Sequence, residues 1–150
     1  MPRRTVPSPL GPLPVHEDGS AITAISWEGG GSDGTPLLVE ACRQLEAYFR
    51  KELSDFDLPL HPSGDAFQQT VNKAMCAIPY GETMEYGEIA RQLGSMPQPV
   101  GNACGRNSIP IIIPCHRVVG ASGLGGFSAP GGVETKVALL KHEGAYGLLI

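Results

Sequence analysis

The sequence predicts an α/β fold in two domains, a small α/β domain over residues 1–62 and a mostly helical domain over residues 63–150. Three observations lead to this prediction. Short apolar runs separated by polar turns fill the first part, apolar residues at helical spacing fill the second, and a proline and a glycine interrupt the chain at His61-Pro62-Ser63-Gly64. A chain of 150 residues, 41% hydrophobic and 17% charged, suits two small globular domains.

The first domain is expected to contain two strands and a helix. Residues 9–15 and 21–27 are apolar runs on either side of the polar turn HEDGS, which is the pattern of paired strands. Residues 37–51 carry apolar side chains at helical spacing, and FDLPL at 56–60 provides a further extended edge. Nothing in this domain indicates chemistry.

The second domain is expected to be a series of short helices. Asp65 is a suitable N-cap for the first helix, residues 86–93 form the second and end at Gly94, and residues 97–105 form the third. A last helix covers residues 133–142. The second and third helices, joined by a short turn, have the outline of a helix-turn-helix, although many buried helix pairs share it.

Charge and cysteine content bear on the partner and the compartment. The net charge is −4, and all of the acidic excess lies before residue 63, so that Arg91, Arg106 and Arg117 could give the second domain a basic face for DNA. The four cysteines form no CxxC pair, which favours a reducing compartment, and no signal or membrane segment is evident. A cytoplasmic protein is therefore expected, with Cys42, Cys76 and Cys104 as small core residues.

The segment IPIIIPCHRVVG carries the candidate chemistry. It is predicted to be a stiff strand, closed by prolines, that presents Cys115 and His116 at its end. A working thiol nucleophile needs a base or a positive neighbour to supply thiolate, and His116 and Arg117 offer both. Glu143, at the end of the last helix, is a candidate to orient the imidazole.

Other interpretations of this segment stay open at the level of the residues. The Cys-His pair alone also fits a core cysteine beside an exposed turn histidine, because such neighbours have no intrinsic catalytic meaning. Cys115, His116, His142 and Glu143 could converge on a metal ion, but adjacent residues of an extended chain point to opposite faces and would not share a ligand sphere comfortably. No metal site is therefore predicted.

The same residues resemble a known family, the O6-alkylguanine-DNA alkyltransferases. The resemblance rests on four motifs in the family's order and covers about residues 36–147: FQQTVNKAMCAIPYGETMEYGEIARQLG, VGNACGRNSIPIII, PCHRV and GGFSAPGGVETKVALLKHEG. It implies a ribonuclease H-like first domain and a winged helix-turn-helix second domain. It also implies direct, irreversible, single-turnover transfer of an alkyl group from O6 of guanine, possibly also from O4 of thymine, to the protein.

The resemblance assigns roles to individual residues. Cys115 would accept the alkyl group, His116 would act as its base through a water molecule, Glu143 would orient that histidine, Asn107 would brace the turn below, and Tyr86 would stack on the base and donate a proton. Base and DNA contacts would come from helix 97–105 and the residue after it, through Gln98, Val100, Gly101, Ala103 and Arg106. Main-chain groups near Cys115 and Val118 would accept from the guanine amine, and the amide of Ser128 would donate toward O6.

These implied roles are chemically consistent, because a thiolate reaches O6 of guanine only after the nucleotide has left the stack. The partner would be double-stranded DNA containing O6-alkylguanine, bound by a monomer without a cofactor. Gln98 departs from the pattern, since many members have an arginine there that fills the gap left by the flipped base. The structural zinc of some members is not indicated either, because the first domain offers only Cys42, His16 and His61.

Two further classes compete with the alkyltransferase. An alkyltransferase-like lesion sensor binds damaged DNA without chemistry, but it typically carries tryptophan at the position of Cys115. A thiol hydrolase or redox protein would act repeatedly and regenerate its thiol.

Overall fold

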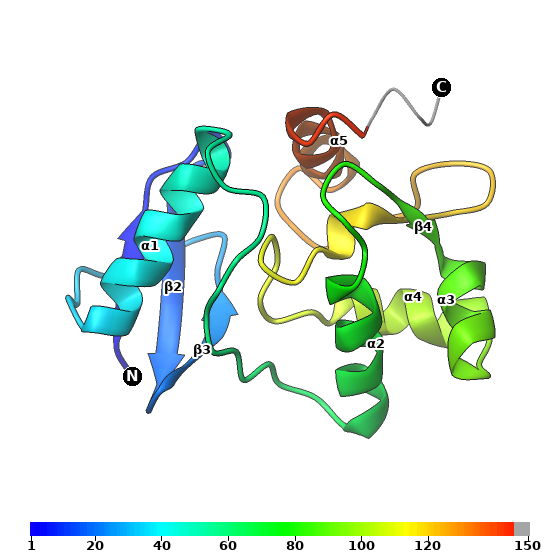
Figure 1. Cartoon of the computed structure of the whole chain (residues 1–150), viewed down its shortest axis with the longest axis horizontal. Helices are drawn as coiled ribbons and strands as arrows, with labels where there is room; N and C mark the ends of the chain where they lie inside the picture. Colours follow the sequence, from blue (N-terminus) through cyan, green and yellow to red (C-terminus); the bar gives the residue numbers. More distant parts are fainter. Residues whose placement is uncertain (146–150) are drawn as a thin grey trace. The chain divides into compact units, whose positions relative to one another are not determined.

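The computed structural model describes residues 1–145, and the chain divides into two compact units, Met1–Pro62 and a second that begins at Ser63. Figure 1 shows their elements in sequence colours. No described helix has both the length and the apolar content that crossing a membrane requires.

The first unit is an antiparallel sheet with one helix. The sheet has the order β1 (Arg3–Val6), β2 (Leu13–Asp18) and β3 (Ala21–Ile25), and α1 (Pro36–Phe49) contacts all three strands (Figure 1). Thr35 begins α1, because its hydroxyl accepts a hydrogen bond from the amide of Leu38 at 3.2 Å. The core of this unit is formed by fully buried apolar residues of β2 and α1, among them Leu13, Val15, Leu38 and Leu45.

The sequence prediction for this unit was partly wrong. The strand expected at 9–15 begins only at Leu13, because Ser8 to Gly11 form a turn in which the amide of Gly11 donates to the carbonyl of Ser8 at 3.0 Å. The short strand β1 was missed, and FDLPL contributes only an isolated bridge from Leu60 to Ile22. Strand β1 and the bridge at Leu60 are short, and each depends on a pairing partner that the local sequence does not reveal.

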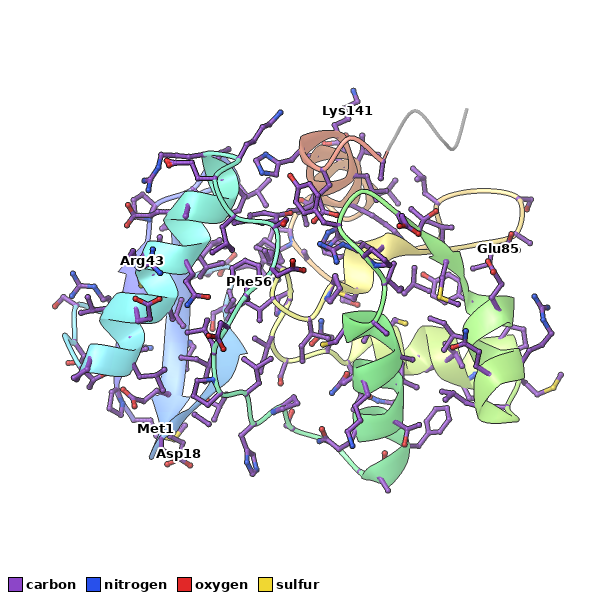
Figure 2. All side chains as sticks on the ribbon, viewed as in Figure 1. Met1, Asp18, Arg43, Phe56, Glu85 and Lys141 are labelled. Atoms are coloured by element: carbon purple, nitrogen blue, oxygen red, sulfur yellow. The ribbon has the colours of Figure 1, made fainter. Side chains whose placement is uncertain are left out.

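Among its described residues, the second unit contains four α-helices, α2 (Ala66–Cys76), α3 (Tyr86–Leu93), α4 (Pro97–Gly105) and α5 (Val133–His142). It also has a parallel pair of two-residue strands, β4 (Met84–Glu85) and β5 (Val118–Val119). Helices α2, α3 and α4 pack on one another. The predicted bounds of α3, α4 and α5 are confirmed, and so is the cap by Asp65, whose carboxylate accepts from the amide of Gln68 at 2.9 Å. Glu85 is the last residue of β4 and the N-cap of α3 (Figure 2).

The strand predicted before Cys115 is wrong. Residues 109–114 form a buried turn in which the amides of Ile112 and Ile113 donate to the carbonyls of Pro110 and Ile109, both at 2.9 Å, and Ile111 has a φ of 75°. Pro110 and Pro114 have no amide hydrogen, so the segment cannot pair along a sheet on both sides. Cys115 therefore begins a short 3-10 helix, η1 (Cys115–Arg117).

Candidate active site

A cavity of about 570 Å³ in the second unit has Cys115 in its wall. The cavity lies against α4, the start of α3 and the loop before α5. Its lining residues are Tyr86, Pro97, Gln98, Gly101, Asn102, Cys104, Gly105, Cys115, Gly126, Phe127 and Ser128. Cys115 is only 8% exposed, so its thiol faces this cavity from a largely buried position.

The environment of Cys115 sets the state of its thiol. Burial raises the pKa of this thiol, and hydrogen bonds from Asn107 and from the amides of Cys115 and His116, together with the charge of Lys136, act in the opposite direction. Burial is the largest of these effects, so the resting thiol keeps its proton at neutral pH. A base is needed to release the thiolate for reaction.

Asn107 holds the turn that carries Cys115. Its side-chain amide donates to the carbonyl of Ile113 at 2.8 Å, and its side-chain oxygen accepts from the amide of Ile109 at 3.0 Å. These two bonds fix both ends of the buried isoleucine turn, and the same side chain also hydrogen-bonds the thiol.

His116 is completely buried and is oriented by Glu143. Its Nε2 lies 2.8 Å from Oε2 of Glu143, whereas Nδ1 has no hydrogen-bond partner among residues 1–145. Burial lowers the pKa of His116 although the nearby carboxylate of Glu143 raises it, which favours a neutral imidazole. A proton on Nε2, donated to Glu143, leaves Nδ1 as a hydrogen-bond acceptor. The histidine is thus not the exposed turn residue that one interpretation of the sequence allowed.

Arg117 does not supply positive charge to the thiol, contrary to the sequence prediction. Its Nε and Nη2 donate to the two carboxylate oxygens of Glu143 at 2.8 and 3.0 Å, and its Nη1 donates to the carbonyl of Ile78 at 2.7 Å. The Arg117 side chain is buried, and its guanidinium is paired with the carboxylate of Glu143. It therefore cannot be part of an exposed basic face either.

Lys136 is the cation beside the thiol, and sequence reasoning missed it. This fully buried residue of α5 donates from Nζ to the carbonyls of Val118 at 2.6 Å and Gly126 at 3.2 Å. Burial lowers the pKa of Lys136 to about 8, although charges on Cys115 and Cys104 would raise it. A signal was present, since Lys136 shares the apolar stripe of Leu139 and Leu140 at helical spacing.

Tyr86 stands at the first position of α3 and lines the cavity. Its hydroxyl lies 3.5 Å from Nζ of Lys136. Burial raises the pKa of Tyr86 to about 12, and charges on Cys104 and Cys115 act in the same direction. The phenol therefore keeps its proton and can donate it to a group in the cavity.

The residues predicted to contact DNA fall into three groups. Gln98, Gly101 and Ser128 line the cavity. Val100, Ala103 and Val118 are fully buried, so their side chains belong to the core. The contact predicted for Val118 is one of its main chain, and its carbonyl accepts from Nζ of Lys136 at 2.6 Å. Arg106 is exposed and lines a separate cavity with Ser63, Gly64, Asp65 and Gln68.

One cysteine differs from its predicted role as a core residue, because Cys76 is exposed on α2. Cys42 and Cys104 are buried in the core as predicted, and Cys104 also lines the same cavity as Cys115. Asn102, Gly105 and Gly126 also line this cavity without having been singled out. Which side of a helix faces a cavity depends on the packing of its neighbours, which local sequence does not determine.

A buried thiol beside an imidazole that a carboxylate orients, in a cavity against a helix pair, is the arrangement of a candidate cysteine nucleophile. Comparison with known proteins agrees with this class. Residues 1–62 match the family model of the 6-O-methylguanine DNA methyltransferase ribonuclease-like domain, and residues 66–145 match that of its DNA binding domain. The chain belongs to the 6-O-methylguanine DNA methyltransferase family, and the predicted fold class is confirmed.

Individual relatives support the assignment over nearly the full length. The "Methylated-DNA--protein-cysteine methyltransferase" of Mycobacterium bovis is 46% identical, over 93% of this chain and 90% of that protein. The protein of the same name from Methanosarcina acetivorans is 42% identical, over 92% of this chain and 95% of that protein. The crystal structure of Mycobacterium tuberculosis OGT in complex with DNA superposes with a TM-score of 0.85 at 44% identity, covering 97% of this chain and 94% of that chain.

Proposed function

We propose that this protein repairs DNA by accepting an alkyl group from O6 of guanine on Cys115, once per molecule. The chain is a DNA-binding protein of the methylated-DNA–protein-cysteine methyltransferase kind. The observation that carries the proposal is the buried His116, whose Nε2 is held by Glu143 while Nδ1 is unpartnered among the described residues. A relative with the same fold was solved with DNA.

The reaction would proceed by direct displacement at the alkyl carbon. A flipped guanine enters the cavity, the thiol proton of Cys115 passes to Nδ1 of His116 through a water molecule, and the sulfur attacks the alkyl carbon. The S–C bond forms as the C–O6 bond breaks, and Glu143 stabilises the imidazolium that results. The product is a thioether, so the acceptor is consumed.

The departing guanine must gain a proton, and Tyr86 is the proposed donor. Its raised pKa, about 12, keeps the hydroxyl protonated until it meets a developing negative charge in the cavity. Lys136, 3.5 Å from that hydroxyl, stabilises the phenolate formed on donation.

The finer features of the partner are also part of the proposal. The substrate is double-stranded DNA with O6-alkylguanine, bound by one copy of the chain through α4. Gln98 and Ser128 line the cavity, and the amide of Ser128 is the proposed donor to O6. The cytoplasm is the expected setting, and O4-alkylthymine is a second lesion to be tested.

A mass measurement tests the proposal. Incubation with a duplex containing O6-methylguanine should add one methyl group per chain on Cys115, and Cys115→Ala should abolish the gain, whereas Cys76→Ala, which removes an exposed thiol, should retain it. A parallel duplex with O4-methylthymine reports the second lesion. Unchanged mass of a protein that binds the damaged duplex would contradict alkyl transfer and support a lesion sensor.

A further inference from the structure

The cavity holds two thiols, and the proposed function uses only one of them. Cys104, on the last turn of α4, and Cys115, on η1, both line it, and both are free. The other two free cysteines lie elsewhere, Cys42 in the first unit and Cys76 on an exposed position of α2. The cavity is therefore a place where one small molecule can meet two sulfur atoms.

The two sulfurs lie within electrostatic range of each other. A negative charge on Cys115 raises the pKa of Cys104, and the same two thiols both interact with Tyr86 and with Lys136. Burial is the largest cause of the raised pKa of Cys104, about 12. Both groups are thus neutral thiols at neutral pH, in a mostly apolar pocket.

The number and kind of donors restrict what the pair can bind. Zinc takes four ligands, and within residues 1–145 no group of three or more His, Cys, Asp or Glu side chains is placed to hold a metal ion. His116 cannot join the pair through Nε2, because Glu143 occupies that atom at 2.8 Å. The cation of Lys136 beside both sulfurs further opposes a free metal cation. A suitable ligand is uncharged and takes only two sulfurs.

We infer that Cys104 and Cys115 form a dithiol site for trivalent organoarsenicals, R–As(OH)₂. Each thiol forms one S–As bond, each As–O bond breaks, and each hydroxide leaves as water with the thiol proton. Arsenic stays trivalent, no electron is transferred, and the adduct adds no charge to the cavity. The organic group R lies in the remainder of the cavity, which has Pro97 and Phe127 in its wall.

This site has a consequence for repair, which rests on the proposed function. An arsenical that bridges the pair occupies the sulfur of Cys115 and the space of the flipped base, so it blocks alkyl transfer. Binding of the arsenical itself does not depend on the proposed function.

Phenylarsine oxide, which hydrates to the dihydroxide, is the probe. The full chain should take up one phenylarsenic group by intact mass and lose two of its four free thiols. After unfolding, iodoacetamide should then label Cys42 and Cys76 but not Cys104 and Cys115. A 1,2-dithiol should reverse the adduct, whereas a monothiol at the same concentration should not.

Variants separate a two-point site from single-thiol labelling. Cys104→Ser should weaken uptake roughly 100-fold or more, since the second bond is an intramolecular one. Cys76→Ser should bind as the wild type does. An adduct that protects only Cys115, or one that Cys104→Ser retains at wild-type affinity, would overturn the inference.

The labelling pattern of the wild-type chain decides the matter even if Cys104→Ser does not fold. Methyl transfer is measured on the same preparation. If the wild type accepts a methyl group but no bridging arsenical, only this inference is wrong, and if it binds the arsenical but accepts no methyl group, only the proposed function is wrong.

Discussion

Glu143 is the residue on which two other site residues depend. Its carboxylate accepts from Nε2 of His116 and from Nε and Nη2 of Arg117, and it is itself buried. One side chain thus sets the tautomer of the base and neutralises a buried guanidinium. Removal of its charge should therefore affect both reactivity and stability.

Glu143→Gln should lower the free energy of unfolding by about 3–5 kcal/mol, because Arg117 is left buried without its counter-charge. Methyl transfer should slow roughly 100-fold, since the imidazolium loses its stabilising partner. Chemical denaturation and single-turnover kinetics measure the two effects. Glu134→Gln, at an exposed position of the same helix, is the matched control and should change stability by no more than about 0.5 kcal/mol. Equal effects of the two substitutions would contradict this account.

Lys136 gives the folded state a distinctive pH dependence. Its pKa falls from 10.5 to about 8 on folding, because burial disfavours the charged form. Below pH 8 both states hold the proton and the full penalty applies. Between pH 8 and 10.5 the folded state releases the proton while the unfolded state keeps it, so this group makes the fold more stable as pH rises.

The stability difference between the wild type and Lys136→Met should therefore shift in favour of the wild type from pH 8 to 10.5. Denaturant titrations at several pH values measure it, and taking the difference cancels the titration of other groups. Lys141→Met, at an exposed position of α5 (Figure 2), is the matched control for replacing a lysine of this helix. A constant difference across this range would show that Lys136 keeps an ordinary pKa.

At the scale of elements, the loop before α5 depends on one close approach to Tyr86. Gly125 has a φ of 76°, and a Cβ added there would lie 2.8 Å from the tyrosine hydroxyl. The carbonyl of the next residue, Gly126, accepts from Lys136. The loop is thus in contact with the proposed proton donor through its backbone.

Gly125→Ala should cost about 1–3 kcal/mol in backbone strain and displace either the loop or Tyr86. Methyl transfer should slow by more than the loss of folded protein explains. Gly123→Ala is the matched control in the same loop, since an added Cβ there meets nothing within 4 Å. Thermal melting and transfer rates of the two variants test this, and indistinguishable variants would refute it.

Helix α4 presents small and neutral residues to the cavity, with Gln98, Gly101 and Gly105 in the wall. Close approach to a narrow groove suits such a surface. Gln98→Arg should tighten binding to damaged duplex and raise the slope of log affinity against log salt by about one charge. Fluorescence anisotropy at several salt concentrations measures this, and an unchanged affinity and repair rate would show that the amide is not at the DNA.

At the scale of the whole molecule, the charge distribution predicts weak electrostatic attraction to DNA. The net charge is −4, and Arg117 and Lys136, two of the second unit's cations, are buried. Affinity of the wild type should therefore fall only gently with salt, in line with a few phosphate contacts. A steep salt dependence, typical of six or more phosphate contacts, would contradict this prediction and indicate a larger basic surface.

The parts of this molecule that sequence predicts are those set by local signals. Asp65 and Gly94 mark helix ends through capping, and Cys115, His116 and Glu143 stood out by residue type and motif. The turn at 109–114 was missed because its hydrogen bonds close within the segment, which an apolar, β-branched composition does not show. Lys136 was missed although it has the helical spacing of the buried Leu139 and Leu140, because lysine is ordinarily a surface residue.

The buried cations Arg117 and Lys136 both donate hydrogen bonds to main-chain carbonyls. Arg117 donates to that of Ile78, and Lys136 to those of Val118 and Gly126. A substitution exchanges side chains but leaves carbonyl groups in place. Substitutions at Pro97, Asn102 or Phe127 in the cavity wall can therefore make room for larger alkyl groups on the base, while Arg117 and Lys136 keep these hydrogen bonds.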